Sequence, residues 1–384
     1  MGIFLLIVGL VLFIGLVVLH ELGHFWAARR GDVKIEEFGI FFPPRLYRRT
    51  TKAGYDFTVN LLPLGGFVRL KGEHDSDTGK GTYGAAPTGV KAKIMLAGVA
   101  MNLITALVLF TFLALVGMPK LVDNQFTIKS DTKIAEQKVL ISYIEPKSPA
   151  SHAGLAVRDQ ISSIGGKPVS SSNALPSLTK QFAGESTQVV YERGGHAHTT
   201  TVTFLTKNAV DASLKTSNPK GYLGIEPTDL TLRRSTWSAP IVAVGLSAQL
   251  TTLTMQGLGH ALAGVGGIFA GLFTGNHVAR EHAQTTASSQ VSGPVGIFMI
   301  LKDGSLLGYQ FMLLIIAVIS LTLAIMNVLP IPALDGGRLF VMLISRALKK
   351  QVTPEAEEAI YGTGFAVLMV LIVIISIVDV KRFL

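Results

Sequence analysis

The chain has 384 residues, of which 49% are hydrophobic and only 15% are charged, with a formal net charge of +9 and no cysteine. Soluble domains carry about 25% charged residues and disordered chains are poor in aliphatic residues, so this composition excludes both classes. The missing thiols exclude a disulfide scaffold and a cysteine-ligated metal, and in so apolar a chain the positive charge is expected in cytoplasmic loops of a membrane protein, with no nucleic-acid partner.

The first apolar run, Ile3–Ala28, is long enough to cross a hydrocarbon core of about 30 Å. It contains His20, Glu21 and His24 within the sequence HELGH. A cleaved signal peptide is the alternative, but no positive charge precedes the run and its end poorly matches a cleavage site. We therefore predict a membrane helix over residues 1–29.

A polar and basic segment follows over residues 30–92, and the positive-inside rule places it in the cytoplasm. Alternating apolar and polar residues over Tyr55–Asn60, then the pair Gly65-Gly66 and a second apolar patch, predict a small β-hairpin in this loop. The next apolar run predicts a second membrane helix over residues 93–118.

Residues 119–228 are less apolar and contain short strand-like runs separated by Gly, Pro and Ser, which predicts a folded β-rich domain outside the cytoplasm. Two later apolar runs predict membrane helices over residues 308–337 and 360–380, joined by a basic cytoplasmic loop over residues 338–359. The expected fold is a polytopic α-helical membrane protein with four transmembrane helices and one inserted β-rich domain. Its expected location is a cell membrane, which it crosses several times.

The spacing of His20 and His24 predicts a metal site, because residues at i and i+4 lie on one face of a helix. Both imidazoles can bind one Zn²⁺, and Glu21 is placed to activate a water molecule. Three ionisable groups in one membrane helix are costly to bury, so a functional role is expected. A polar cluster that only bonds to neighbouring helices is the alternative.

A catalytic zinc takes three protein ligands and keeps one position open, so a third ligand is needed. Asp335 follows an apolar run and is flanked by Pro and Gly residues that end the helix there. Non-helical backbone at membrane depth is tolerated mainly around an enclosed site. We therefore predict that Asp335 is the third ligand, with a helix N-cap as the alternative role.

The shared metal also decides how the ambiguous apolar run Pro240–Gly275 is interpreted. The two histidines lie near the C-terminal end of the first membrane helix, and Asp335 follows the C-terminal end of the third, so these helices must be parallel. A single crossing by Pro240–Gly275 would put Asp335 on the opposite face of the membrane. We therefore predict an extracytoplasmic membrane-surface helix and linker over residues 229–307.

Together these motifs resemble the site-2 protease family of intramembrane zinc metalloproteases, and most closely its bacterial branch typified by the regulator of sigma-E protease. The resemblance covers nearly the whole chain. The motifs that carry it are His20-Glu21-x-x-His24, Gly98-x-x-x-Asn102, Ser292-Gly293-Pro294-Val295-Gly296-Ile297 and Asn327-x-x-Pro330-x-Pro332-x-Leu334-Asp335-Gly336.

The inserted domain is similar to a single PDZ domain. The motifs behind this resemblance are Ser148-Pro149-Ala150, Ala153-Gly154-Leu155, Asp159-x-Ile161 and Ile164-Gly165-Gly166. Arg158 replaces the glycine that usually precedes the aspartate, which we expect to alter a surface turn without affecting the fold. The resemblance predicts the shape of a PDZ domain more securely than it predicts peptide binding.

The family resemblance implies regulated intramembrane proteolysis of single-span membrane proteins, near the cytoplasmic side of a bacterial inner or plasma membrane. Substrates of the anti-sigma factor or remnant signal peptide type are implied. Glu21 is then the catalytic base, and Asn102 and Asn327 contact the substrate backbone or oxyanion, although either could instead bridge helices. The Gly65-Gly66 hairpin matches the family's membrane-associated β element and is the candidate edge for holding an extended substrate.

Two alternatives from other functional classes remain open, a membrane metal carrier and a catalytically inert membrane PDZ adaptor. A carrier should have further intramembrane ligands along a path, whereas the remaining histidines lie mostly outside the predicted spans. An adaptor would not need Glu21.

Overall fold

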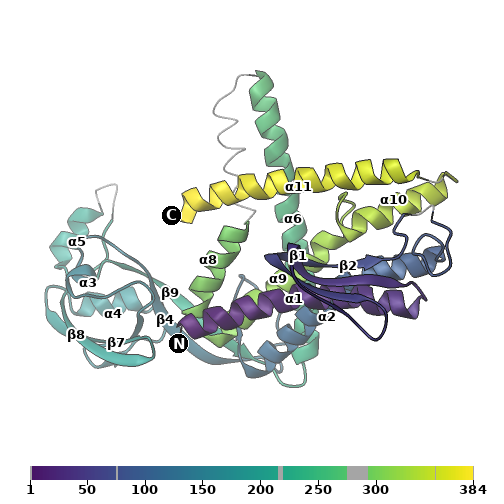
Figure 1. Cartoon of the computed structure of the whole chain (residues 1–384). Helices are drawn as coiled ribbons and strands as arrows, with labels where there is room; N and C mark the ends of the chain where they lie inside the picture. Colours follow the sequence, from purple (N-terminus) through teal and green to yellow (C-terminus); the bar gives the residue numbers. More distant parts are fainter. Residues whose placement is uncertain (1, 75–76, 215–218, 275–292, 351, 384) are drawn as a thin grey trace. The chain divides into compact units, whose positions relative to one another are not determined.

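The computed structural model describes residues 2–74, 77–214, 219–274, 293–350 and 352–383 (Figure 1). The chain divides into two compact units. Residues 2–112 and 240–384 form one, which we call the membrane unit, and residues 113–239 form the other, which we call the β unit.

The membrane unit contains two strands and most of the helices. Its elements are α1 (Gly2–Arg30), β1 (Ile35–Thr50), β2 (Asp56–Leu70), α2 (Thr88–Val116, which ends in the β unit), α6 (Ala239–Thr274), α8 (Pro294–Ser305), α9 (Tyr309–Val328), α10 (Asp335–Ala347) and α11 (Pro354–Phe383). Five helices among the described residues, namely α1, α2, α6, α9 and α11, are long and apolar enough to cross a membrane.

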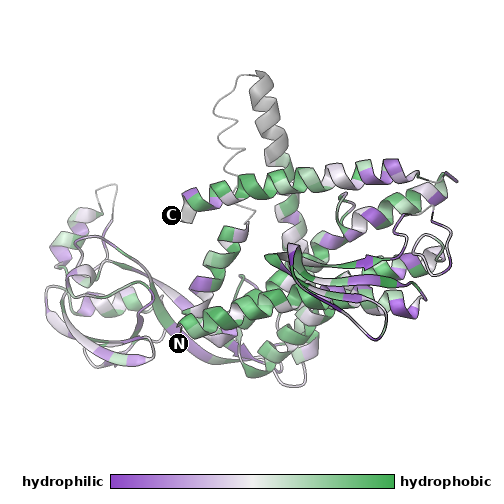
Figure 2. Ribbon diagram, viewed as in Figure 1, coloured by the Kyte–Doolittle hydropathy of each residue, from purple (hydrophilic) through white to green (hydrophobic). Residues whose placement is uncertain are grey.

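Apolar residues make up most of α1, α2 and α9, as the green colour in Figure 2 shows, and large apolar side chains are exposed on several of the long helices. Val11, Val108 and Val367 are each more than 60% exposed. Soluble monomers rarely expose apolar surface this extensive. In contact with lipid chains, exposed apolar surface has no unfavourable free energy of hydration. The chain is therefore a multi-pass membrane protein.

The helix α6 is the least apolar of the five candidates. It buries Val242, Ala243 and Leu246 on one face while Ile241 and Val244 stay exposed on another. Apolar residues on both faces fit either a helix that crosses the membrane or one embedded at its surface. The number of four transmembrane helices therefore stays a prediction. The end of the run at Gly275 and the start of the motif at Ser292 lie outside the described residues.

Two predicted boundaries differ from the structure. The helix α2 begins at Thr88, ahead of the apolar run, because Lys91 is fully buried with its ammonium 5.4 Å from the centre of the Tyr83 ring. The predicted loop over residues 338–359 contains most of the helix α10, whose Met342 and Ser345 are buried one turn apart. Both differences arise from amphipathic turns that a search for continuous apolar runs does not detect.

Glycines let α1 and α2 approach each other closely. A Cβ atom on Gly23 would lie 2.5 Å from the Ala97 carbonyl oxygen, so only a glycine fits there. On another face, Leu16 of α1 forms a buried cluster with Leu301 of α8 and Met312 of α9. Small residues at one interface and large interlocking residues at the other are typical of membrane helix packing.

The strands β1 and β2 form a small sheet in which both strands fold back. Phe38 pairs with Phe57 on one side and with Val68 on the other. Among the residues that the structure describes, the last part of β2, residues 66–70, has a strand partner on one side only. We call residues 66–70 the edge strand.

The β unit is built on a twisted sheet with the strand order β3-β9-β4-β5-β7-β8 and β6 paired to β5. Its strands are β3 (Met118–Pro119), β4 (Lys133–Ile144), β5 (Gln160–Ile164), β6 (Lys167–Pro168), β7 (Ser186–Arg193), β8 (His196–Thr203) and β9 (Ile225–Arg234), and its short helices are α3 (Pro149–His152), α4 (Leu175–Gln181) and α5 (Lys207–Ser213). The core packs around Ile141, Ile161, Val189 and Phe204.

The turn that precedes β5 is held by a charge pair between the buried Asp159 and the exposed Arg193. Both carboxylate oxygens of Asp159 accept hydrogen bonds of 2.7 Å from the Arg193 guanidinium, a bidentate geometry. Arg158, where the sequence departs from the usual glycine, has a φ of +76°. The turn keeps the left-handed conformation that glycine adopts easily, and the arginine accepts the strain.

Candidate metal centre

The helix α1 places His20 and His24 one turn apart on the face that meets α2. Their Nε2 atoms are 3.1 Å apart, and the two rings meet edge to face. The face is set by the 3.6-residue period of the helix, and Gly23, which lies between the two histidines, permits the close contact with α2. The predicted ligand pair therefore converges on one point.

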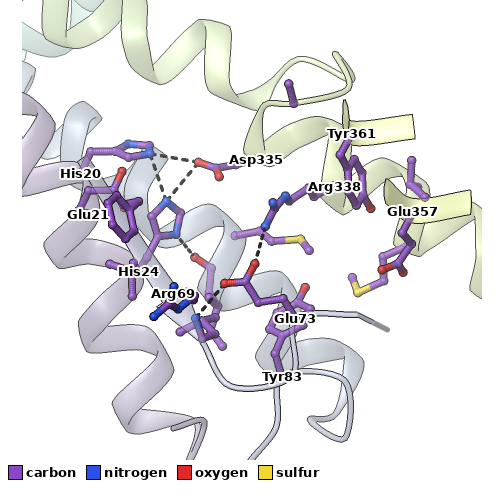
Figure 3. A pocket seen from close by; sticks show the side chains of 18 of the residues that line it. His20, Glu21, His24, Arg69, Glu73, Tyr83, Asp335, Arg338, Glu357 and Tyr361 are labelled. Atoms are coloured by element: carbon purple, nitrogen blue, oxygen red, sulfur yellow. Dashed lines mark hydrogen bonds and ion pairs between the residues drawn. The ribbon is translucent and has the colours of Figure 1, made fainter. Parts of the chain in front are cut away.

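Asp335 reaches the same point from the start of α10. Its Oδ2 atom lies 3.2 Å from Nε2 of His20 and 3.3 Å from Nε2 of His24 (Figure 3). Leu334 occupies the N-cap position of α10 and Asp335 is the first helical residue. Gly336 makes this turn possible, because a Cβ atom there would lie 2.2 Å from the Val328 carbonyl oxygen.

These three side chains fit a metal ion. Among the described residues they form the one group of His, Asp and Glu ligand atoms that lie within 4.8 Å of one another. His24 donates from Nδ1 to the Ile94 carbonyl oxygen at 2.7 Å, so the Nε2 of its neutral ring presents a lone pair. The Asp335 Oδ2 atom is buried and accepts no hydrogen bond.

Three lone pairs that converge in a buried space repel one another unless a cation lies between them. A tetrahedral zinc with ligand distances of about 2.0–2.2 Å separates its ligand atoms by roughly 3.3–3.6 Å, close to the spacing found here. Two nitrogens and one carboxylate oxygen also match the ligand set of catalytic zinc, which leaves one position open.

The helix α2 supports the histidines from behind. The Asn102 amide lies 3.2 Å from Nδ1 of His20, and the Asn102 side chain is buried. When Nε2 of His20 binds a metal, its Nδ1 carries the proton, so Asn102 must present its oxygen there. This requires the amide oxygen and nitrogen to exchange places, since Nδ2 is the atom next to His20. The Ser320 hydroxyl of α9 donates to the Asn102 carbonyl oxygen at 2.8 Å.

Gly98 brings the backbone of α2 against the same two rings. A Cβ atom there would lie 2.4 Å from Nε2 of His24 and 2.6 Å from Cε1 of His20. The Gly98-x-x-x-Asn102 motif thus covers about one helical turn of α2 behind the metal ligands. Its glycine lies at one end of that turn and its asparagine amide at the other. Its spacing is that of two residues on one helix face.

Glu21 faces a cavity that the three ligand residues also line. Its Cγ atom would lie 3.1 Å from a Cβ atom on Gly66, so the edge strand passes directly beside it. Val68 of the edge strand lines the same cavity. A carboxylate next to the metal ligands can accept a proton from water in the cavity.

The cavity has a volume of about 600 Å³ and runs from the ligand residues to a polar end. At that end Arg338 lies 3.9 Å from Glu73 and stacks over the Tyr361 ring (Figure 3). Glu357 is buried and lies 3.3 Å from Nδ1 of His74. Sequence reasoning missed these residues. Their only signal was that charged residues flank two apolar runs, and this is ordinary for cytoplasmic loops.

The remaining predicted site residues lie in two places. Gly66 lines the cavity, and Gly65 beside it would place a Cβ atom 3.0 Å from the Phe42 ring. Asn327 is half-buried near the end of α9 and does not line the cavity. Ser320, a hydroxyl in an apolar helix, was the missed signal for the contact with Asn102.

Comparison with known proteins places the chain in a defined group. The sequence matches the model of peptidase family M50 over residues 8–371. It is 27% identical over 376 residues to a Clostridium perfringens protein whose name marks it as an inferred zinc metalloprotease, with 98% of each chain covered. It is 25% identical over 448 residues to the zinc metalloprotease RasP of Shouchella clausii, and 24% identical over 458 residues to the regulator of sigma-E protease RseP of Escherichia coli, with 96% of each chain covered in both cases.

Proposed function

The chain belongs to peptidase family M50 and is a zinc metalloprotease, and on this premise we propose that it cuts peptide bonds inside the transmembrane segments of single-span membrane proteins. One observation carries the proposal. His20 and His24 belong to a helix apolar enough to cross a membrane, and Asp335 lies within 3.3 Å of both. A zinc held at membrane depth acts on peptide bonds at that depth.

We assign the zinc ligands to His20, His24 and Asp335 and the general base to Glu21. Bound zinc would polarise the scissile carbonyl and lower the pKa of water. The Glu21 carboxylate faces the cavity, where it can accept a proton from the attacking water and then pass it to the leaving amine.

The edge strand is proposed to hold the substrate. A helical segment keeps its carbonyl oxygens in i to i−4 hydrogen bonds, so it must unwind before water can attack. The edge strand lines the cavity beside Glu21 and has a strand partner on one side only among the described residues. An extended substrate can add to its other side, and at Gly65 and Gly66 a second backbone can approach closely.

The two asparagines are given different roles. The contact between Asn102 and His20 supports the helix-bridging role for Asn102, in which it orients His20 with Nε2 toward the metal. Asn327 lies outside the cavity lining, so its proposed contact with substrate rests on the family resemblance alone.

Sidedness and substrate type rest on the sequence. The basic loops place the metal centre near the cytoplasmic side of a bacterial inner or plasma membrane and the β unit, proposed to be a PDZ domain, on the other side. A relative is named as a regulator of sigma-E protease. That name supports substrates of the anti-sigma factor type, with remnant signal peptides as a second type. The domain ranges predicted above carry over as part of this proposal.

The test is cleavage in a bilayer. The purified protein is reconstituted with zinc and with a single-span substrate, and the cut is mapped by mass spectrometry of the products. The proposal predicts a cut inside the transmembrane segment. A matched substrate whose segment is a continuous run of leucine, which is harder to unwind, should be cut more slowly than one with a central glycine pair. Cuts confined to residues outside the segment would overturn the proposal.

A further inference from the structure

A basic depression lies on the surface of the β unit, away from the metal centre in sequence. It has a volume of about 240 Å³, and its lining residues are Thr127, Lys129, Thr132, Lys133, Ile134 and Arg233. Among the residues that the structure describes, none forms an ion pair with Lys129, Lys133 or Arg233. Two hydroxyl groups complete the polar lining.

The nearest acidic side chain does not neutralise these cations. Asp131 accepts hydrogen bonds at 2.7 Å from the Thr236 N–H and at 2.6 Å from the Ser238 hydroxyl, at the start of α6. These hydrogen bonds hold the pKa of Asp131 well below its usual range, so it stays ionised. Its carboxylate does not line the depression, and one ionised carboxylate beside three cationic side chains leaves an excess of positive charge there.

The depression lies next to the end of a membrane helix. The strand β3 begins two residues after α2 ends, and its Met118 pairs directly with Arg233. Paired residues on antiparallel strands have Cα atoms about 5 Å apart. The neighbouring Arg234 donates from Nε to the Leu115 carbonyl oxygen of α2 at 2.8 Å. Because α2 is a membrane-crossing candidate, a bilayer that it crosses would end close to Arg233.

Exposed apolar side chains accompany the cations. Ile134, which lines the depression, is 61% exposed, and Trp237 is 65% exposed. Trp237 lies between the two residues that bond to Asp131, so it belongs to the same part of the surface. Tryptophan is enriched at membrane interfaces, where one part of the ring meets acyl chains and the other meets headgroups.

We propose that this depression binds the phosphate of an anionic phospholipid and so holds the β unit to the membrane surface. A guanidinium, two ammonium groups and two hydroxyls are the donors that recognise a phosphate, and three cations favour a lipid with a net negative charge. Lys129 and Lys133 reach the headgroup while Ile134 and Trp237 meet its apolar boundary. An acidic protein segment is the alternative ligand for these cations. It would not explain the exposed apolar side chains beside the depression or the position of the depression at the end of α2.

The test uses the full chain in a neutral detergent and follows quenching of Trp237 by brominated lipid. The chain has two tryptophans, so Trp26→Phe leaves Trp237 as the reporter. Brominated phosphatidylglycerol should quench saturably and at least tenfold more tightly than brominated phosphatidylcholine. Removing one cation near a charged lipid surface should weaken binding about fivefold, so each of Lys129→Gln, Lys133→Gln and Arg233→Gln should show that shift.

Combining the three substitutions should weaken phosphatidylglycerol binding at least tenfold. A matched control, Lys147→Gln with Lys180→Gln and Lys207→Gln, removes the same charge elsewhere on the β unit and should bind as the parent does. Equal binding of the two lipids, equal loss in both triple variants, or displacement by a polyglutamate peptide would each overturn the proposal. If the triple variant loses its thermal transition and so is not folded, lipid binding by the three single variants tests the proposal instead.

Discussion

Replacing Gly98 by alanine should damage the metal centre without touching a ligand. The added Cβ atom would lie 2.4 Å from Nε2 of His24 and 2.7 Å from Nε2 of His20. Ordinary contact between heavy atoms begins at about 3.5 Å, so one ring or the α2 backbone must move by roughly 1 Å. A shift of this size in groups that position ligands should cost 10- to 100-fold in zinc affinity.

The assay for Gly98→Ala is zinc content after purification, followed by competition with a chelator of known affinity. Gly15→Ala is the matched control, because it lies in α1 and its added Cβ atom would meet nothing within 4 Å. The control should bind zinc and cleave substrate as the parent does. Parental zinc affinity in Gly98→Ala would refute the reasoning, since the atoms placed against the histidines would then have no effect on the metal they are proposed to hold.

Three further predictions concern other residues. Asp335→Ala should leave purified protein with less than one zinc per chain, and full zinc occupancy would favour the helix-start role over the ligand role. Asn102→Leu should lower zinc affinity 10- to 100-fold while the thermal transition persists, and an unchanged chelator titration would count against its contact with His20. Arg158→Gly should raise the unfolding free energy of the β unit by up to about 1 kcal/mol, because glycine relieves left-handed strain of about 1–2 kcal/mol but adds chain entropy to the unfolded state. Arg158→Ala keeps the strain and should show no such gain in a thermal melt.

The metal ligands could be predicted from the sequence because few roles other than metal binding explain ionisable side chains whose burial in a membrane costs so much free energy. Two histidines at helical spacing and a glutamate in one apolar run would be expensive without a function, and Asp335 is set apart by the Pro and Gly residues around it. The Gly98 motif was identified as a pattern. Its physical reason, a backbone pressed against two imidazoles, depends on how α1 and α2 cross and is not encoded in either helix alone.

The register of the edge strand and the polar end of the cavity could not be predicted. Alternation over Tyr55–Asn60 indicates a strand, but the double pairing of Phe38 depends on a long-range register that local periodicity does not contain. Glu357 and Arg338 belong to segments that are distant from each other and from the HELGH motif, and each alone is typical of a loop. The position of α6 in the membrane also stays a prediction, since lipid contact and protein burial both select apolar residues.

The measurement that tests the central claim most directly compares the parent protein with Glu21→Gln in the same proteoliposomes, with zinc content and cleavage followed together. Glu21 is not among the three converging ligand atoms, so the variant should keep one zinc per chain. Loss of the proton acceptor should lower cleavage of the transmembrane substrate by 100-fold or more. Cleavage at the parental rate by zinc-loaded Glu21→Gln would contradict the account, because the reaction would then not depend on the carboxylate that the fold places beside the metal centre.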